Sequence, residues 1–355
     1  MKKIEKYLRN LLIVIASVSV MQSCTQEAEP AAEASANPKA DKLDPGSAKG
    51  NEVLTLTGSG LGEITSIVFD KGDVPAPFNP VYNTDKSLIF RVPDTANGGE
   101  QNIIITNKIG KQFSVPFNVI ALPLVSTVSN YNFVEGTQIT LSGNNLEDVS
   151  SVVLNGSSDE ATIVSKNKKQ LVIKMPASNA NTVSLVITNP TGPITTTQEF
   201  VNLDKAFKIF ADNYENGFEN GSWGPAEVSS EYIKSGSKSF KATYNKGNWS
   251  ADGFANWNAG CAYSPDFKYL SFWVKGASAD YVLYITGDQR AGGYGNSDRS
   301  APIVIPANVW TYFKIPLSSL GLWAKGNTFK QLGFWIEGPD KQNESFYFDD
   351  VIFVK

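Results

Sequence analysis

The sequence contains no histidine, only two cysteines, and no excess of positive charge. Histidine is the side chain whose ordinary pKa suits proton transfer near neutral pH. Its absence excludes Ser-His-Asp and Cys-His catalysis and ordinary zinc sites. The chain has 31 lysine and arginine residues against 35 aspartate and glutamate residues. Without an excess of positive charge to bind phosphate groups, we expect no nucleic-acid partner. Catalysis by two carboxylates needs no imidazole and stays open.

The two cysteines, Cys24 and Cys261, lie far apart in the sequence, which does not indicate a disulfide framework. Before Cys24 the chain has a basic start and then an apolar run, residues 11–21, too short for the roughly 20 residues of a bilayer-spanning helix. This pattern predicts a secretory signal. The run ends in VMQSC, which resembles the cleavage site of a bacterial lipoprotein and implies removal of residues 1–23 and lipidation of Cys24. A signal peptide with an incidental cysteine is the alternative.

Residues 24–46 are rich in alanine, proline and acidic residues and show no apolar periodicity. This composition is typical of a flexible, solvated tether. The early Glu27 and Glu29 resemble the signal that directs lipoproteins to the outer face of the outer membrane. We therefore expect a surface-exposed protein, lipid-anchored in the cell outer membrane through Cys24.

Two segments of the chain are copies of each other. LTLTGSGLGEITSIVFD, residues 54–70, aligns with ITLSGNNLEDVSSVVLN, residues 139–155, and further motifs follow in the same order. Apolar and polar residues alternate between Gly, Asn and Pro turns, which predicts short strands with one buried face. The motifs resemble the immunoglobulin-like, plexin, transcription-factor (IPT/TIG) family. We expect two tandem IPT/TIG-like immunoglobulin-type β-sandwiches, residues 47–121 and 122–204, acting as spacers or, alternatively, binding a protein at a strand edge.

The composition changes at about residue 205, because all seven tryptophans and ten of the thirteen tyrosines follow this point. Short alternating runs such as YLSFWVKG and LGFWIEG predict strands, and no helical pattern intervenes. We expect residues 205–355 to form an antiparallel jelly-roll β-sandwich, which makes the whole chain all-β.

Strand parity separates core aromatics from outward-facing ones. Trp273, Tyr284 and Trp335 fall opposite the apolar set of their strands. An aromatic on an outward sheet face either forms a binding surface or is covered by a loop, and we weigh these two interpretations equally. Trp310 opens a strand beside two other aromatics, and we expect it in the core.

Four tryptophans lie in loop-like sequences whose small or polar neighbours cannot bury them: Trp223, Trp249, Trp257 and Trp323. Flat indoles beside amide side chains suit sugars, which offer apolar C–H faces for stacking and hydroxyls around the rim. Candidate rim partners are Asn256, Asn258, Gln289 and Arg290.

Trp249 and Trp257 stand eight residues apart in the stretch GNWSADGFANWNAG. One continuous strand would separate the two indoles by roughly 26 Å. Asp252-Gly253 is a turn signal, and a hairpin there would fold the indoles toward each other. Both geometries offer a platform, for ligands of different length.

The order of lipoprotein signal, IPT/TIG repeats and Trp-rich jelly roll resembles the surface glycan-binding proteins of Bacteroidota polysaccharide-utilisation systems. It resembles in particular the type whose last domain binds xyloglucan or a related β-glucan. More specific marks are FADNYENGFENGSWG, SGSKSFKATYNKGNW and FYFDDVIF. The resemblance implies a non-catalytic protein that stacks the polysaccharide on exposed aromatics, with an outer-membrane glycan importer and other surface glycan-binding proteins as partners. The predicted carbohydrate-binding residues are Trp223, Trp249, Asn256, Trp257, Arg290 and Trp335.

Two other functions stay open: an adhesin that binds a protein partner, and a glycosidase built on a carboxylate pair drawn from Asp252, Asp288, Glu337 and Asp340. No cofactor is expected to be required. Asp212 and Asp349, with Glu215, are candidate ligands of a structural calcium, because jelly-roll carbohydrate modules often hold one between their first and last strands. Alternatively, Asp349 and Asp350 close a sheet edge with charge.

Overall fold

The computed structural model describes residues 33–296 and 298–355, so the predicted signal peptide, Cys24 and the first part of the predicted tether lie outside the described residues. The described elements are β-strands, joined by turns and by short 3-10 helices at Pro80–Tyr82 (η2) and Leu317–Ser319 (η3). This confirms the all-β prediction. The chain divides after Ala121 into two compact units.

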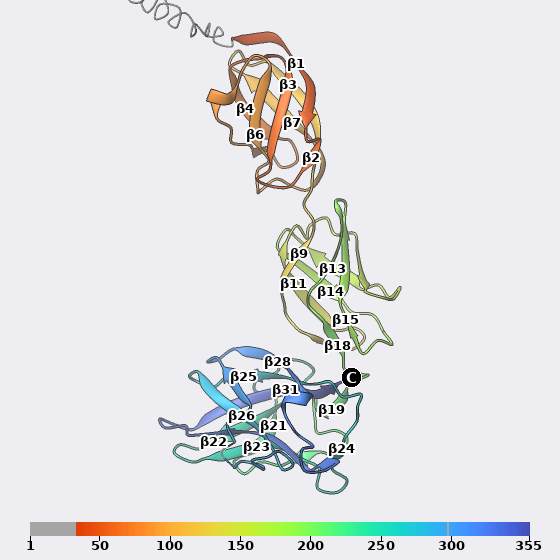
Figure 1. Cartoon of the computed structure of the whole chain (residues 1–355), viewed down its shortest axis with the longest axis vertical. Helices are drawn as coiled ribbons and strands as arrows, with labels where there is room; N and C mark the ends of the chain where they lie inside the picture. Colours follow the sequence, from red (N-terminus) through yellow and green to blue (C-terminus); the bar gives the residue numbers. More distant parts are fainter. Residues whose placement is uncertain (1–32, 297) are drawn as a thin grey trace, which may run out of the picture. The chain divides into compact units, whose positions relative to one another are not determined.

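The first unit is a β-sandwich of two sheets (Figure 1), with strand orders β1-β3-β6 and β2-β8-β7-β4-β5. Period-two alternation fills its core, because Leu54 and Leu56 are fully buried while the alternate residues Thr55 and Thr57 face outward. The strands are β1 (Ala34–Asp44), β2 (Ser47–Ala48), β3 (Val53–Leu61), β4 (Ile64–Phe69), β5 (Val74–Pro75), β6 (Ser87–Arg91), β7 (Gly99–Asn107) and β8 (Gln112–Val119).

The prediction of a flexible tether is wrong for residues 34–44, which form β1. This strand pairs antiparallel with β3, from Ala34 opposite Leu61 to Asp44 opposite Thr55. Its sequence resembles a solvated tether because β1 is an edge strand whose side chains are half-buried or exposed. Lysine and proline are the residues that edge strands use to discourage pairing with other chains. The first sandwich therefore begins near residue 34 instead of residue 47.

The second unit begins with another sandwich, whose sheets have the orders β13-β14-β11-β9, β12-β16-β17 and β10-β18-β15. The aligned motifs of the repeat form corresponding strands, with β11 and β12 in the places of β3 and β4. The strands are β9 (Leu124–Val128), β10 (Asn132–Phe133), β11 (Gln138–Asn144), β12 (Ser151–Leu154), β13 (Thr162–Lys166), β14 (Gln170–Lys174), β15 (Thr182–Val183), β16 (Leu185–Asn189), β17 (Gly192–Thr195) and β18 (Phe200–Asn202).

The rest of the second unit is a larger sandwich of two antiparallel sheets, ordered β21-β22-β31-β25-β28, with β19 also on β31, and β20-β23-β30-β26-β27. Successive strands repeatedly change sheet, as from β22 to β23 and from β25 to β26, which is jelly-roll topology. The strands are β19 (Phe207–Phe210), β20 (Glu219–Asn220), β21 (Ala226–Ser229), β22 (Ser239–Tyr244), β23 (Ser250–Ala255), β24 (Cys261–Ala262), β25 (Tyr269–Lys275), β26 (Tyr281–Gly287), β27 (Pro302–Ile305), β28 (Trp310–Pro316), β29 (Thr328–Phe329), β30 (Gln331–Ile336) and β31 (Glu344–Val354).

Aromatic side chains fill the jelly-roll core between the two sheets. Phe334 of β30 stacks on Phe348 of β31, with ring centroids 4.3 Å apart. Phe272 of β25 lies edge-on to Phe334 at 5.0 Å. The core uses one face of each sheet, so the opposite faces are available for other contacts.

The outward face of β25 contacts the preceding sandwich of the same unit. Trp273 is buried there, and its Nε1 donates a hydrogen bond to Asn130 Oδ1 at 3.0 Å. The ring of Tyr131 stacks on Tyr312 with centroids 4.6 Å apart. Trp273 is thus covered, which decides between its two predicted roles.

Candidate functional site

The outer face of the sheet β20-β23-β30-β26-β27, here called the aromatic face, carries side chains in cross-strand register. Ala251 lies opposite Trp335, which in turn lies opposite Tyr284. The pairing ends at Ser250 opposite Ile336, and continuing the same register by one residue brings Trp249 opposite Glu337. One step in the other direction, Gly253, Gly333 and Thr286 form the next row. Strand parity therefore puts Trp249, Tyr284 and Trp335 on one face.

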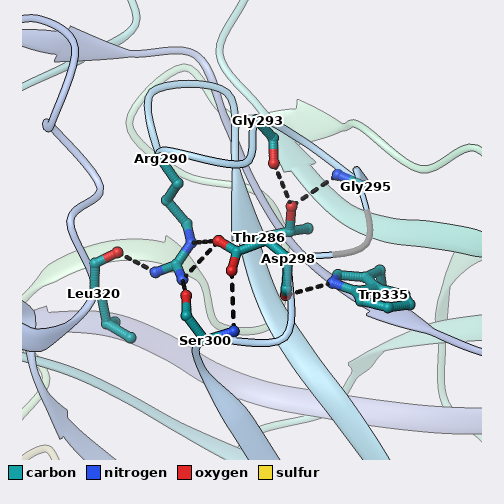
Figure 2. Close-up of polar contacts among 8 residues, drawn as sticks. All are labelled: Thr286, Arg290, Gly293, Gly295, Asp298, Ser300, Leu320 and Trp335. Carbon is teal, nitrogen blue, oxygen red and sulfur yellow. Dashed lines mark hydrogen bonds and ion pairs between the residues drawn. The ribbon is translucent and has the colours of Figure 1, made fainter.

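Trp335 is the buried centre of the aromatic face. It stacks on Tyr284 with ring centroids 4.7 Å apart, and Trp249 lies against it at 6.0 Å. Its Nε1 donates a hydrogen bond to the Asp298 carbonyl at 3.0 Å (Figure 2), and its side chain is only 1% exposed. The prediction that Trp335 contacts the ligand is wrong, because a loop covers it. Trp335 instead supports the exposed ring of Trp249.

The covering loop, described over residues 288–296 and 298–300 and called loop 288–300 below, is held by Arg290 (Figure 2). The guanidinium donates to Asp298 Oδ2, at 3.0 Å from Nη2, and to Ser300 Oγ at 2.6 Å, and it also bonds the Leu320 carbonyl. Burial raises the pKa of Asp298, but hydrogen bonds from Ser300 and the charge of Arg290 lower it more, so the pKa lies below its ordinary value. Arg290 is 3% exposed, so its predicted place at the rim is wrong. Arg290 instead holds the loop in place through these hydrogen bonds.

Glycines let this loop approach the sheet closely. A Cβ at Gly333 would lie 2.7 Å from the hydroxyl of Tyr294, which the loop lays over the strands. That hydroxyl donates to the carbonyl of Gly221 at 3.1 Å. Gly295 has a φ of +68° and packs against the Trp223 ring, where a Cβ would come within 2.4 Å. Glycine at position 295 is therefore required by contact as well as by backbone conformation.

Trp223 stands at the edge of the aromatic face beside β23. Its backbone N–H donates to the Ala251 carbonyl at 3.0 Å, and its ring meets Tyr294 edge-on at 5.5 Å. The next residue, Gly224, donates its N–H to Asp252 Oδ1 at 2.7 Å. These contacts fix the backbone of the segment, yet the Trp223 side chain is 59% exposed. An exposed indole whose backbone is held in place suits stacking on a ligand.

Trp249 borders a cavity of about 520 Å³ over the open end of the same face. The Trp249 side chain is 56% exposed. Because two residues along a strand and one strand across separate Cα atoms by about 8 Å, Trp223 and Trp249 are near neighbours. The cavity is lined by Gly247, Trp249, Asp280, Tyr281, Val282, Tyr284, Ile336, Glu337, Gly338 and Asp340.

Strand β23 runs unbroken from Ser250 to Ala255, so the hairpin that Asp252-Gly253 suggested does not form. A Cβ at Gly253 would lie 2.4 Å from the Cα of Gly333, so this glycine serves the close approach of two strands instead of a turn. Trp249 and Trp257 therefore lie beyond opposite ends of one strand, roughly 26 Å apart at full extension.

Trp257 is 48% exposed at the far end of β23. The adjacent Asn256 is buried, with its Nδ2 bonded to the Asn216 carbonyl at 3.0 Å and its Oδ1 accepting from the amides of residues 259 and 260. The prediction that Asn256 bonds a ligand is therefore wrong, and Asn256 shapes the turn that carries Trp257. Of the other rim candidates, Asn258 is exposed, while Gln289 is half-buried and bonds Asp288.

Two further tryptophans differ from their predicted positions. Trp323 packs against the jelly-roll core, and its Nε1 bonds the Cys261 carbonyl at 2.9 Å. Neighbours distant in the sequence, such as Phe353 and Phe267, partly bury it. Trp310 shares the outward face of β28 with Tyr312, where it lies opposite Lys275 and is half-buried. The expectation of a core position for Trp310 is therefore wrong.

The candidate catalytic carboxylates lie in different surroundings. Glu337 and Asp340 are exposed and line the cavity beside Trp249, whereas Asp252 is buried. Burial raises the pKa of Asp252 to about 6, but the side chain points into the sandwich and has no exposed surface. Asp288 accepts hydrogen bonds from the backbone amides of Lys330 and Gln331. Glu337 forms an ion pair with Arg299.

The candidate calcium ligands instead bind backbone amides of one loop. Asp212 Oδ1 accepts from Ser237 and Lys238, and Asp349 Oδ2 accepts from Lys234 and Ser235. Burial, followed by the charge of Asp350, raises the pKa of Asp349 to about 8. In the described part of the chain, no group of three or more Asp, Glu, Cys or His side chains is arranged to hold a metal ion.

The fold is thus a pair of immunoglobulin-type sandwiches followed by a jelly roll with exposed indoles on one sheet. The family model of the IPT/TIG domain matches residues 123–201, the second sandwich. No curated protein sequence matches the chain. Within the described residues, we find no helix with the length and apolar character to cross a bilayer.

Solved structures of surface glycan-binding proteins are similar to this chain. PbSGBP-B from Prevotella bryantii is 18% identical, with a TM-score of 0.54 over 91% of this chain and 99% of that one. An SGBP-B from a complex xyloglucan utilization locus in Bacteroides uniformis is 21% identical, with a TM-score of 0.43 over 90% of this chain and 99% of that one. The likeness to the Prevotella protein shows a shared fold and agrees with the layout recognised in the sequence.

Proposed function

We propose that the chain is a non-catalytic glycan-binding protein that lays a polysaccharide across the aromatic face of its jelly roll. One observation carries this proposal: Trp223 and Trp249 are more than half exposed, yet each rests on a buried aromatic ring, Tyr294 or Trp335. A large aromatic ordinarily gains by burial. Exposed rings on a fixed second layer of rings form an apolar surface ready for a ligand.

The polysaccharide that we propose is a β-glucan such as xyloglucan. Indoles side by side on a sheet suit a chain whose sugar rings present flat apolar faces in succession. The support for the glycan class is the fold shared with the Prevotella bryantii surface glycan-binding protein, together with the family motifs in the sequence.

We also propose a lipid anchor at Cys24 in the outer membrane, with the polysaccharide delivered to a glycan importer or to other surface glycan-binding proteins. The signal and the VMQSC motif support this anchor. In this arrangement the two IPT/TIG-like sandwiches hold the jelly roll away from the membrane. Replacing Cys24 by serine should abolish incorporation of labelled fatty acid, and retained labelling would contradict the anchor.

A polysaccharide panel tests the binding proposal. The chain from residue 25 onward is run in native gels that contain β-glucans, mannans, xylans or no glycan, and its migration is compared. We expect retardation by at least one β-glucan and no release of reducing sugar. Unchanged migration in every gel would refute glycan binding, and release of reducing sugar would identify an enzyme instead.

A further inference from the structure

The cavity beside Trp249 has an unusual charge. The acidic residues in its lining are Asp280, Glu337 and Asp340. Among the described residues, no lysine or arginine lines it. All three are exposed. The remainder of the lining is aromatic, aliphatic or glycine. A ligand on the aromatic face would therefore contact apolar rings and negative charge together.

Neighbouring groups offset only part of this charge. Arg299 pairs with Glu337 from outside the cavity, and both members of the pair are about half exposed. Asp280 Oδ1 accepts the Ala307 amide at 2.7 Å. Lys246 and Lys341 lie on nearby loops, but neither lines the cavity. The charges of Asp280 and Asp340 thus face the ligand without a cationic partner in the lining.

This arrangement has a chemical consequence for the ligand. Ionised carboxylates accept hydrogen bonds and cannot donate them. Sugar hydroxyls donate to them, and such bonds are roughly twice as strong as bonds between neutral groups. An anionic substituent on the ligand would instead meet two or three like charges at short range, partly screened by salt.

We propose that the carboxylates of this cavity select an uncharged polysaccharide and reject glycans that carry uronic acid, carboxyl or sulfate groups. This inference rests on the proposed glycan-binding function. Specificity here comes from repulsion as well as attraction, since the apolar rings alone would stack sugars of either kind. Asp280 and Asp340 contribute most, because Arg299 offsets the charge of Glu337.

The probes are hydroxyethyl cellulose and carboxymethyl cellulose of equal length and degree of substitution. Both derivatives lose the same number of sugar hydroxyls and gain substituents of similar size. They differ in charge and in the terminal hydroxyl of the hydroxyethyl group, and the salt dependence of binding isolates the contribution of charge. If the panel identifies another glycan, the same two groups are placed on that glycan. Binding constants are measured by calorimetry at low and high salt. The selectivity ratio is the dissociation constant for the charged derivative divided by that for the neutral one. We expect this ratio to be at least about ten for the wild-type chain at low salt and to fall at high salt.

Two sets of variants should move this ratio in opposite directions. Asp280→Asn with Asp340→Asn removes two charges and should narrow the ratio several-fold. Arg299→Gln releases Glu337 from its ion pair and should widen it. The control is Asp266→Asn with Glu227→Gln, which changes the net charge equally at exposed positions outside the cavity lining and should leave the ratio unchanged.

Equal binding of the two derivatives by the wild-type chain would overturn the inference, as would a ratio that follows net charge alone in the control variant. Either result leaves the proposed glycan binding intact. If no glycan of the panel binds at all, the proposed function itself fails. The two failures are therefore distinguishable.

Discussion

The indole of Trp249 lies against the indole of Trp335, with 6.0 Å between ring centroids and 32° between ring planes. Trp335 is fixed by its hydrogen bond to the Asp298 carbonyl and by its stack on Tyr284. Because Trp249 rests on this fixed ring, its side chain loses little conformational freedom when a ligand stacks on it. Ordering a free side chain on binding costs about 0.5–1.5 kcal/mol, and the buried layer removes much of this cost.

Replacing Trp249 or Trp223 by alanine should weaken glycan binding at least tenfold, about 1.4 kcal/mol for each residue. The physical reason is loss of the stacking surface. Calorimetry with the glycan found in the panel measures the change. Trp310→Ala is the matched control, because Trp310 is a partly exposed tryptophan on the other sheet of the same sandwich. If all three substitutions weakened binding equally, the effect would be one of folding, and the aromatic face would lose its assignment.

Trp257→Ala should weaken binding of long polymers and leave short oligosaccharides unaffected. Trp257 and Trp249 lie beyond opposite ends of β23, roughly 26 Å apart, so only a long chain reaches both. Titration of wild type and variant with a short oligosaccharide and with the polymer separates the two cases. A loss of affinity for the short ligand would place Trp257 within the main site instead.

Arg290→Gln should lower the free energy of unfolding by about 3 kcal/mol, because removing one member of a buried ion pair leaves the other charge uncompensated. Loop 288–300 should then release Trp335, and acrylamide should quench tryptophan fluorescence more strongly. Arg299→Gln is the control, since its ion pair with Glu337 is exposed and contributes about 0–1 kcal/mol. Equal stability of the two variants would contradict the role of Arg290 in holding the loop in place.

Asp252→Asn should change how stability depends on pH. Burial raises the pKa of Asp252 to about 6 in the folded protein, whereas an unfolded aspartate has a pKa of about 3.9. The folded state thus holds the proton more tightly, so Asp252 makes the protein less stable as pH rises from about 4 through 6. The asparagine variant lacks this term and should gain up to about 3 kcal/mol relative to wild type across that window.

Urea unfolding of both proteins at several pH values measures this difference. The control is Asp266→Asn, an exposed carboxylate of the same sandwich. A stability difference between Asp252→Asn and wild type that does not vary with pH would show that folding does not raise the pKa of Asp252.

Much of the fold was predictable because period-two alternation is a local signal. The Leu54 and Leu56 pattern predicts a half-buried strand, and repetition of the motif predicts a second sandwich of the same kind. The local signal was misleading in β1, because no residue of this strand is fully buried and its sequence shows no apolar alternation. Its residues have the composition of a tether. It was also misleading at Gly253, where a turn signal marks close contact between two strands.

The candidate site was predictable only in part. Strand parity placed Trp335 and Tyr284 on the outward face correctly, but parity says nothing about what covers that face. Arg290 and Asn256 looked like ligand-binding residues because arginine and asparagine are polar. Their partners, Asp298 and Asn216, lie outside the β-strands on which the parity argument depends.

The sequence by itself determined the all-β class, the repeated sandwich, the tryptophan-rich last domain and the exclusion of imidazole chemistry. These follow from composition and short-range periodicity. Only the tertiary structure decided which indoles are free. Burial depends on contacts between distant segments: loop 288–300 covers Trp335, the preceding sandwich covers Trp273, and nothing comparable in the described structure covers Trp223 and Trp249.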